Sequence, residues 1–236
     1  MIDFIGSYCG SPPTAATWAL RWNGDVFLIA VLVLGAMGMV RLNVPRRRAG
    51  LIAVGVLAIA FLSPLCALSV ALFSARTLHH LLLIGVAAPL LAIAVPTRST
   101  PPPAIAFALA TVLLWVWHLP AAYDAALANK ALYWVMQASL LGSAWAYWLA
   151  VRRADPPVAL ALIGAGAAQM GFLGAILTFA ARPLYASHLS TTVPFGIGPL
   201  ADQQLAGLAM WVLGLVPYAV VGATILRTSW RWRLAI

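Results

Sequence analysis

The chain has 236 residues, of which 64% are hydrophobic and 8% are charged. Soluble proteins carry roughly 25% charged residues, so this composition excludes a soluble domain and predicts an all-α polytopic membrane protein. The formal net charge of +9 does not indicate nucleic-acid binding, because the basic residues separate apolar runs and do not gather on one polar face.

Seven apolar runs are long enough to cross a bilayer, since a crossing helix needs about 20 residues. We expect these spans at residues 25–42, 50–73, 77–96, 103–120, 131–150, 157–181 and 203–226. Short connections with Pro, Arg or Gly separate them, which predicts one transmembrane helical-bundle domain over residues 1–236. Pro64, Pro89 and Pro217 fall inside spans and should kink them. No basic segment precedes a short apolar stretch at the start, so we expect no cleavable signal peptide.

The basic residues predict the orientation. With the N-terminus outside and the C-terminus in the cytoplasm, ten of the 14 basic residues lie inside, which fits the positive-inside rule. The inner residues are Arg41, Arg46, Arg47, Arg48, Arg98, Arg152, Arg153, Arg227, Arg231 and Arg233; the outer ones are Arg21, Arg76, Lys130 and Arg182.

The middle of each predicted span carries no Asp, Glu, Lys or Arg. Because buried ionisable groups are typical of ion pathways, this pattern argues against an ion-coupled transporter or pump. Gln137 and Gln169 are the main polar exceptions. The sixth span is rich in Gly and Ala, which permits close helix approach.

All four histidines fall on the predicted outer side: His79 and His80 begin the third span, His118 ends the fourth, and His188 precedes the seventh. Imidazole, carboxylate and thioether groups are ligands that copper uses, the softer ones favouring the cuprous ion. These groups define a candidate copper pocket at the outer ends of the helices, made of His80, His118, Asp124, Asp202 and Met210, with Arg76 and His79 close by.

Each candidate also has a structural interpretation. A histidine at the membrane boundary is commonly an interfacial polar residue, and Asp202 can cap the seventh helix. Met210 and Trp211 can be packing residues, and Gln169 can make an interhelical hydrogen bond. The chain contains no order of residues typical of a hydrolase.

The two cysteines, Cys9 and Cys66, form neither a disulfide framework nor a paired CxxC metal site. A disulfide between them is allowed, but nothing in the sequence supports it.

Four segments together resemble the CtaG family of bacterial cytochrome c oxidase assembly factors. They are HHLLLIGVAAPLL from His79, WHLPAAYDAAL from Trp117, LTFAARPLY from Leu177 and ADQQLAGLAMW from Ala201. The resemblance implies a multipass bacterial plasma-membrane protein that helps to mature a haem-copper oxidase, with cytochrome c oxidase subunits as partners and copper as the cofactor. The residues that match the family pattern are His80, His118, Asp124, Asp202, Gln203, Gly207, Met210 and Trp211.

The chain departs from this family at two places. Family members often read His-x-x-x-His at the start of the third helix, where this chain has Arg76 in the first position. A second His-x-x-x-His expected in the fifth helix appears here as Tyr133 and Gln137. A cation at Arg76, on the same face as His80, should disfavour a second positive charge and suit an acidic partner such as Asp124 or Asp202.

Three functions follow as hypotheses. The leading one is a non-enzymatic oxidase assembly factor with cuprous ion in the outer pocket. The second is a structural accessory subunit that stays bound to the oxidase, which the reduced ligand set favours. The third is a membrane cytochrome with His80 and His118 as axial haem ligands.

Overall fold

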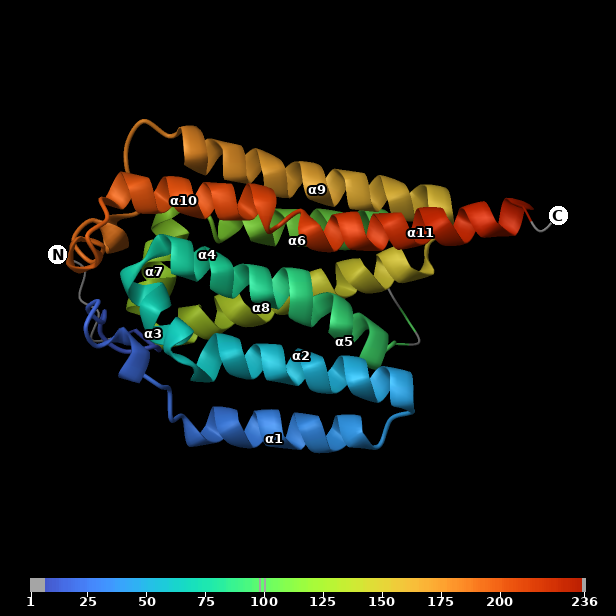
Figure 1. The fold of residues 1–236 in the computed structure, drawn as a ribbon, viewed down its shortest axis with the longest axis horizontal. Helices are drawn as coiled ribbons and strands as arrows, with labels where there is room; N and C mark the ends of the chain where they lie inside the picture. The colour runs from blue at the N-terminus through green and yellow to red at the C-terminus, as the bar shows by residue number, and fades with distance from the viewer. Residues whose placement is uncertain (1–6, 98, 100, 235–236) are drawn as a thin grey trace.

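The computed structural model of the protein describes residues 7–97, 99 and 101–234, and the side chains up to residue 230 (Figure 1). Arg98, Arg231 and Arg233, which the sequence places on the inner side, lie outside the described side chains. All regular secondary structure in the described residues is helical, as predicted.

Three described helices, or helix runs, are long and apolar enough to cross a membrane: Phe73–Ala94, Pro156–Phe179 and Pro199–Trp230. Two bent helix pairs raise this number to five where each pair is one span. The chain is therefore a multi-pass membrane protein. Helix α1 (Val26–Val40) is apolar but has only 15 residues. Helix α8 (Lys130–Arg153) is continuous over 24 residues, but its apolar sequence contains Gln137, serines and several Tyr and Trp residues.

The predicted second span is two helices, α2 (Val44–Leu62) and α3 (Pro64–Ala71), which meet at a bend of 50°. Ser63 separates them: its hydroxyl accepts a hydrogen bond from the Leu65 amide at 3.2 Å, while Pro64 cannot donate to a continuing helix. The kink predicted at Pro64 is thus confirmed. The predicted start at residue 50 is wrong, because α2 begins six residues earlier, after the Asn43 cap.

The third predicted span consists of α4 (Phe73–Leu81), a π-helical turn η3 (Leu82–Ala87) and α5 (Ala88–Ala94). The Ala88 amide bonds to the Leu83 carbonyl, five residues back, and not to Ile84. Pro89, the next donor position, has no N–H, so no helical partner remains for the Ile84 carbonyl. The indole Nε1–H of Trp148 on α8 donates to that carbonyl at 2.9 Å and so satisfies the irregularity that precedes Pro89.

The fourth predicted span ends early, because α6 (Pro103–Val116) stops before His118 and Pro120 begins a separate helix, α7 (Pro120–Ala128). The two helices are bent by 75°. In Figure 1, α7 lies at the same end of the bundle as α3 and the chain's N-terminal segment. The turn between α6 and α7 therefore carries His118 at that end, and α7 carries Asp124.

The remaining helices are α9 (Pro156–Phe179), α10 (Pro199–Val212) and α11 (Val216–Leu234), with α10 and α11 interrupted just before Pro217. Helices α9 and α10 touch at glycines. A Cβ atom on Gly207 would lie 2.6 Å from the Gly174 carbonyl oxygen, which is too short for any side chain. The close approach predicted from small residues in the sixth span is confirmed, and it fixes α10 against α9.

The helices run side by side along one axis, with the described N-terminal segment at one end and the C-terminal end of α11 at the other (Figure 1). The beginnings of α4 and α10, the end of α6, and the 182–198 connection all meet at the end where the N-terminal segment lies. We call this the histidine end. The arginines of the α2 start and the α8 end lie at the opposite end.

Candidate functional site

His80 on α4 and His118 after α6 lie side by side, with ring centroids 6.1 Å apart. The Nδ1 of His118 lies 2.7 Å from the Leu114 carbonyl oxygen. Because a carbonyl only accepts, His118 Nδ1 carries the proton and its Nε2 keeps a lone pair. His80 Nε2 is buried and has no hydrogen-bond partner among the described residues. The pair therefore offers two imidazole nitrogens, His80 Nε2 and His118 Nε2, that accept no hydrogen bond from the described part of the chain.

The other two histidines take different places. His79 is fully buried, and its ring meets the edge of Phe61 at 4.9 Å between centroids. His188 lies on the short helix η4 (Ala186–His188) and is also buried. Its Nδ1 donates to the Ala71 carbonyl at 3.3 Å, so its Nε2 accepts from the Tyr123 hydroxyl at 2.7 Å. Each of the four histidines is 8% exposed or less, so none presents its ring at the surface of the protein.

Burial lowers the pKa of His188 to about 3, and the nearby charge of Arg76 acts in the same direction. The neutral ring is the form that both hydrogen bonds require. His188 is therefore a structural connector between α3, α7 and the 182–198 connection.

Both candidate carboxylates are engaged in helix and loop contacts. Asp202 on α10 accepts from the Phe73 amide at 2.6 Å and the Ser74 amide at 3.3 Å, and from the Ser74 hydroxyl. Asp202 therefore caps the start of α4. The sequence interpretation, in which it caps its own helix, is not what the structure shows. Asp124 on α7 accepts from the Ser187 amide at 3.1 Å and the Ser187 hydroxyl at 2.5 Å. Each carboxylate thus joins two segments that are distant in sequence.

The other residues singled out from the sequence lie on α10 and α9. Met210 is 2% exposed and belongs to the apolar cluster that includes Leu81 and Leu114. Gln203 Oε1 accepts from the Leu184 amide at 2.7 Å, which fastens the connection after α9. Trp211 is 38% exposed and lies near Phe179. The interhelical bond expected for Gln169 is confirmed, since Trp115 Nε1–H donates to its Oε1 at 3.0 Å.

Arg76 is the unexpected member of this end. Its side chain is 1% exposed, and none of Nε, Nη1 and Nη2 has a hydrogen-bond partner among the described residues. The guanidinium carbon lies 5.3 Å from the ring centroid of Tyr133, a cation–π contact. The prediction of an acidic partner for Arg76 is wrong. Asp202 bonds to the start of α4 and Asp124 to Ser187, and neither forms an ion pair with Arg76.

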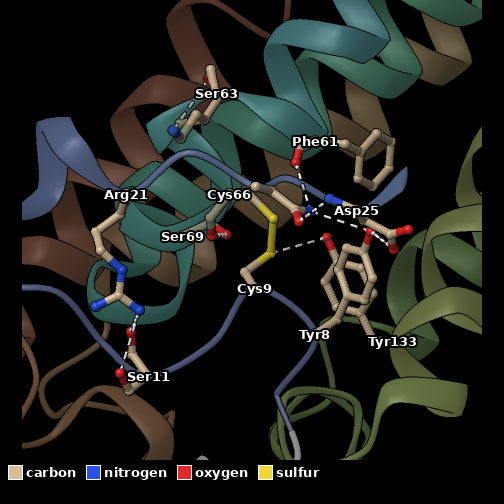
Figure 2. The surroundings of a disulfide bond; sticks show 12 residues. Tyr8, Cys9, Ser11, Arg21, Asp25, Phe61, Ser63, Cys66, Ser69 and Tyr133 are labelled. Atoms are coloured by element: carbon tan, nitrogen blue, oxygen red, sulfur yellow. Dashed lines mark hydrogen bonds between the residues drawn. A yellow bond between two sulfur atoms is a disulfide. The ribbon is translucent and has the colours of Figure 1, made fainter. Parts of the chain in front are cut away.

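A disulfide joins Cys9 to Cys66, with Cα atoms 5.4 Å apart, and ties the N-terminal segment to α3. Figure 2 shows Tyr133 beside it: Cys9 Sγ and the Tyr133 hydroxyl are 3.5 Å apart, and the hydroxyl donates because a disulfide sulfur carries no hydrogen. On the same segment, Tyr8 donates to Asp25 Oδ2 at 2.7 Å, a bond that lowers the pKa of the Asp25 carboxyl. The sequence offered no signal for this bridge beyond the presence of two cysteines.

The sequence model of one family, the cytochrome c oxidase caa3 assembly factor family (Caa3_CtaG), matches residues 26–232. The chain belongs to this family. The match covers every helix from α1 to nearly the end of α11, including the segments that carry His80, His118, Asp124 and Asp202. Comparison with curated proteins gave no significant match, and comparison with solved structures gave none either.

This Caa3_CtaG member has few clustered metal ligands. Among the described residues, no three His, Cys, Asp or Glu side chains are grouped so that they could hold a metal ion. What the histidine end does present is the imidazole pair of His80 and His118, with the cation of Arg76 one turn away from His80.

Proposed function

We propose that this family member is a non-enzymatic maturation factor for a haem-copper cytochrome c oxidase in a bacterial plasma membrane. Family membership over residues 26–232 supports the oxidase as its partner. The observation that carries a role for the histidine end is the His80–His118 pair. His80 Nε2 has no hydrogen-bond partner among the described residues, and His118 Nε2 keeps its lone pair because Nδ1 donates to Leu114. The nearby carboxylates, by contrast, are committed to structural bonds.

We further propose seven crossings with the N-terminus outside. Counted this way, α1, the α2–α3 pair, the α4–η3–α5 run, α6, α8, α9 and the α10–α11 run each cross once. The Cys9–Cys66 bridge supports this orientation, because disulfides persist in oxidising compartments outside the cytoplasm. The arginines at the opposite end agree with the positive-inside rule. The histidine end then faces outward.

In this proposal His80 and His118 would hold a single cuprous ion, which imidazole ligands suit. Two nitrogens bound to one metal ion lie about 4 Å apart at most, a separation that rings 6.1 Å apart can provide. The ion would supply the copper for an oxidase centre. Asp124, Asp202 and Met210 are left out of this smaller set, because their contacts are with the protein.

The decisive experiment compares oxidase maturation and copper content in one strain background. A strain lacking the gene is complemented with the wild type, His80→Ala, His118→Ala or the matched control His79→Phe. We expect the wild type and the control to restore oxidase activity and to bind about one cuprous ion per chain under reducing conditions. Both alanine variants should lose the ion and most of the activity.

Other outcomes would change the proposal. Full maturation by both alanine variants, with no copper in the wild type, would overturn the copper role. Co-purification with mature oxidase in fixed stoichiometry would then identify a structural accessory subunit, which the committed carboxylates favour. A Soret band in the purified protein would instead indicate haem on the same histidine pair.

A further inference from the structure

An apolar groove lies between the starts of α6 and α9, at the end of the bundle opposite the histidine end. Its volume is about 460 Å³, which is within the range of pockets that hold small molecules and cofactors. Apolar side chains make its walls, among them Pro103, Ala104 and Phe107 of α6 and Val158, Ala161 and Ala165 of α9. We call it the α6–α9 groove.

The groove is open because each of the two helices packs mainly against other helices. Helix α6 lies along α8, whereas α9 lies along α10 and α11. The small side chains of Ala104, Ala161 and Ala165 do not fill the space that remains. Water would find almost no hydrogen-bond partner on these walls, so the occupant is apolar.

The shape of the groove favours a single extended chain over a helix. Along α9 it reaches from Val158 to Ala165, which is about 10 Å at the rise of an α-helix. The volume spread over this length gives a cross-section well below that of a helix, which is about 10 Å wide with its side chains. A lipid acyl chain lying along the helices is narrow enough to enter.

Positive charge lies at the open end of the groove. The guanidinium of Arg153, the last residue of α8, donates to the Thr97 carbonyl in the connection that leads to α6. Arg153 therefore lies between the two connections that precede the walls of the groove. Arg152 beside it is exposed, and Asp155 is the acidic residue at this end among those that the structure describes. The positive ends of the α6 and α9 dipoles add to the same potential.

We propose that the α6–α9 groove binds one anionic phospholipid, with an acyl chain between the two helices and its phosphate beside Arg153. A guanidinium suits this headgroup, because it can donate two parallel hydrogen bonds to phosphate oxygens. Basic residues between helices at a membrane surface favour anionic over zwitterionic lipids. The inference goes beyond the proposed oxidase role and does not rest on it, since it concerns the opposite end of the protein.

The test counts the lipids that stay on the purified full-length protein, by native mass spectrometry in mild detergent. Phosphatidylglycerol and phosphatidylcholine with identical acyl chains are offered in equal amounts. The wild type should retain one phosphatidylglycerol and prefer it by about five-fold or more. Ala161→Trp, which fills the groove, should lower this retention several-fold. Ala168→Trp makes the same change at an exposed position farther along the same face of α9 and should retain the lipid as the wild type does.

A second pair of variants tests the headgroup. Arg153→Gln should still retain a lipid but lose about five-fold of the preference for phosphatidylglycerol. Arg48→Gln is the control, because Arg48 is exposed on α2 at the same end, and it should keep the preference. Equal retention of both lipids by the wild type, or equal losses in Ala161→Trp and Ala168→Trp, would overturn the proposal. A lipid-free wild-type dimer that Ala161→Trp dissociates would also overturn it and assign the groove to a second copy of the chain.

Discussion

The carboxylate of Asp202, early in α10, lies 2.6 Å from the backbone amide of Phe73, the first residue of α4. Two helices separated by more than a hundred residues are thereby joined at the histidine end. Because α4 carries Arg76, His79 and His80, this bond helps to position these three side chains relative to α10. Removal of this hydrogen bond should shift the first turn of α4.

Asp202→Ala should destabilise the protein by about 1–3 kcal/mol, since it removes the α4 cap and leaves buried donors without a partner. Asp202→Asn should cost less, because it keeps one carbonyl acceptor. Thermal unfolding of the purified protein measures both. Asp155→Ala is the control: Asp155 is exposed and makes no capping bond with its side chain at the start of α9. Equal losses in Asp202→Ala and Asp155→Ala would contradict the capping role.

Gly207→Ala should destabilise the protein by about 1–3 kcal/mol through overpacking. The added methyl group would overlap the Gly174 carbonyl and the Thr178 hydroxyl across the α9–α10 contact. Gly164→Ala on α9 has open space around its Cβ position and should be neutral or slightly stabilising. Unfolding temperatures of the two variants give the answer, and similar values for both would refute the packing account.

Trp148→Phe should destabilise by about 1–3 kcal/mol, because the Ile84 carbonyl would lose its substitute partner inside the membrane region. Trp145→Phe makes the same chemical change on the same helix. Since Trp145 Nε1 has no partner among the described residues, its loss should be tolerated. The difference in unfolding temperature between the two variants reports the bond to Ile84, and no difference would argue against it.

Stability should fall as the pH is lowered from about 6.5 toward about 3, in part through His188. The folded protein keeps its imidazole neutral because burial holds the pKa of His188 at about 3, whereas the unfolded chain binds a proton near pH 6.5. Protons therefore favour unfolding throughout this window, by up to about 1.4 kcal/mol per pH unit. His188→Gln should show a shallower decline of Tm with falling pH; profiles of equal slope would rule the contribution out.

Reduction of the Cys9–Cys66 bridge should lower the free energy of unfolding by about 2–5 kcal/mol, because the unfolded chain without the bridge gains conformational entropy. The double variant Cys9→Ser/Cys66→Ser should unfold at the temperature of the reduced wild type. Thiol labelling followed by mass spectrometry should find no reactive cysteine until the protein is reduced and unfolded. Labelling of the native protein without reductant would contradict a formed bridge.

The sequence predicts the helices well and their interruptions in part. Apolar length located every long helix, and prolines located the break at Pro64. Helix α2 began earlier than expected because the three arginines that follow Asn43 were assigned to a loop. They form its first turn, where their side chains can extend away from the apolar region.

The site was less predictable, for physical reasons. Residue type identified Asp124 and Asp202 as polar groups of the histidine end, but their partners are backbone amides of distant segments, which no local pattern reveals. Arg76 was expected at the boundary with water, because a buried guanidinium is rare. The bridge between Cys9 and Cys66 depended on tertiary proximity alone.

The π-helical turn η3 changes the rotation of α4 about the helix axis relative to α5, and so changes which neighbours each helix faces. Such a turn holds one residue more than an α-helical turn, so α4 is rotated by about 100° relative to an uninterrupted continuation of α5. The alanines of α5 pack against α2 and α8, whereas α4 packs against α3 and α10. On α4, His79 faces Phe61 of α2 and His80 faces His118 after α6. Loss of one residue within Leu82–Ala87 would therefore preserve the packing of α5 and turn His79 and His80 toward different neighbours. A single residue in η3 therefore determines which neighbours the side chains of α4 face, without changing how α5 packs.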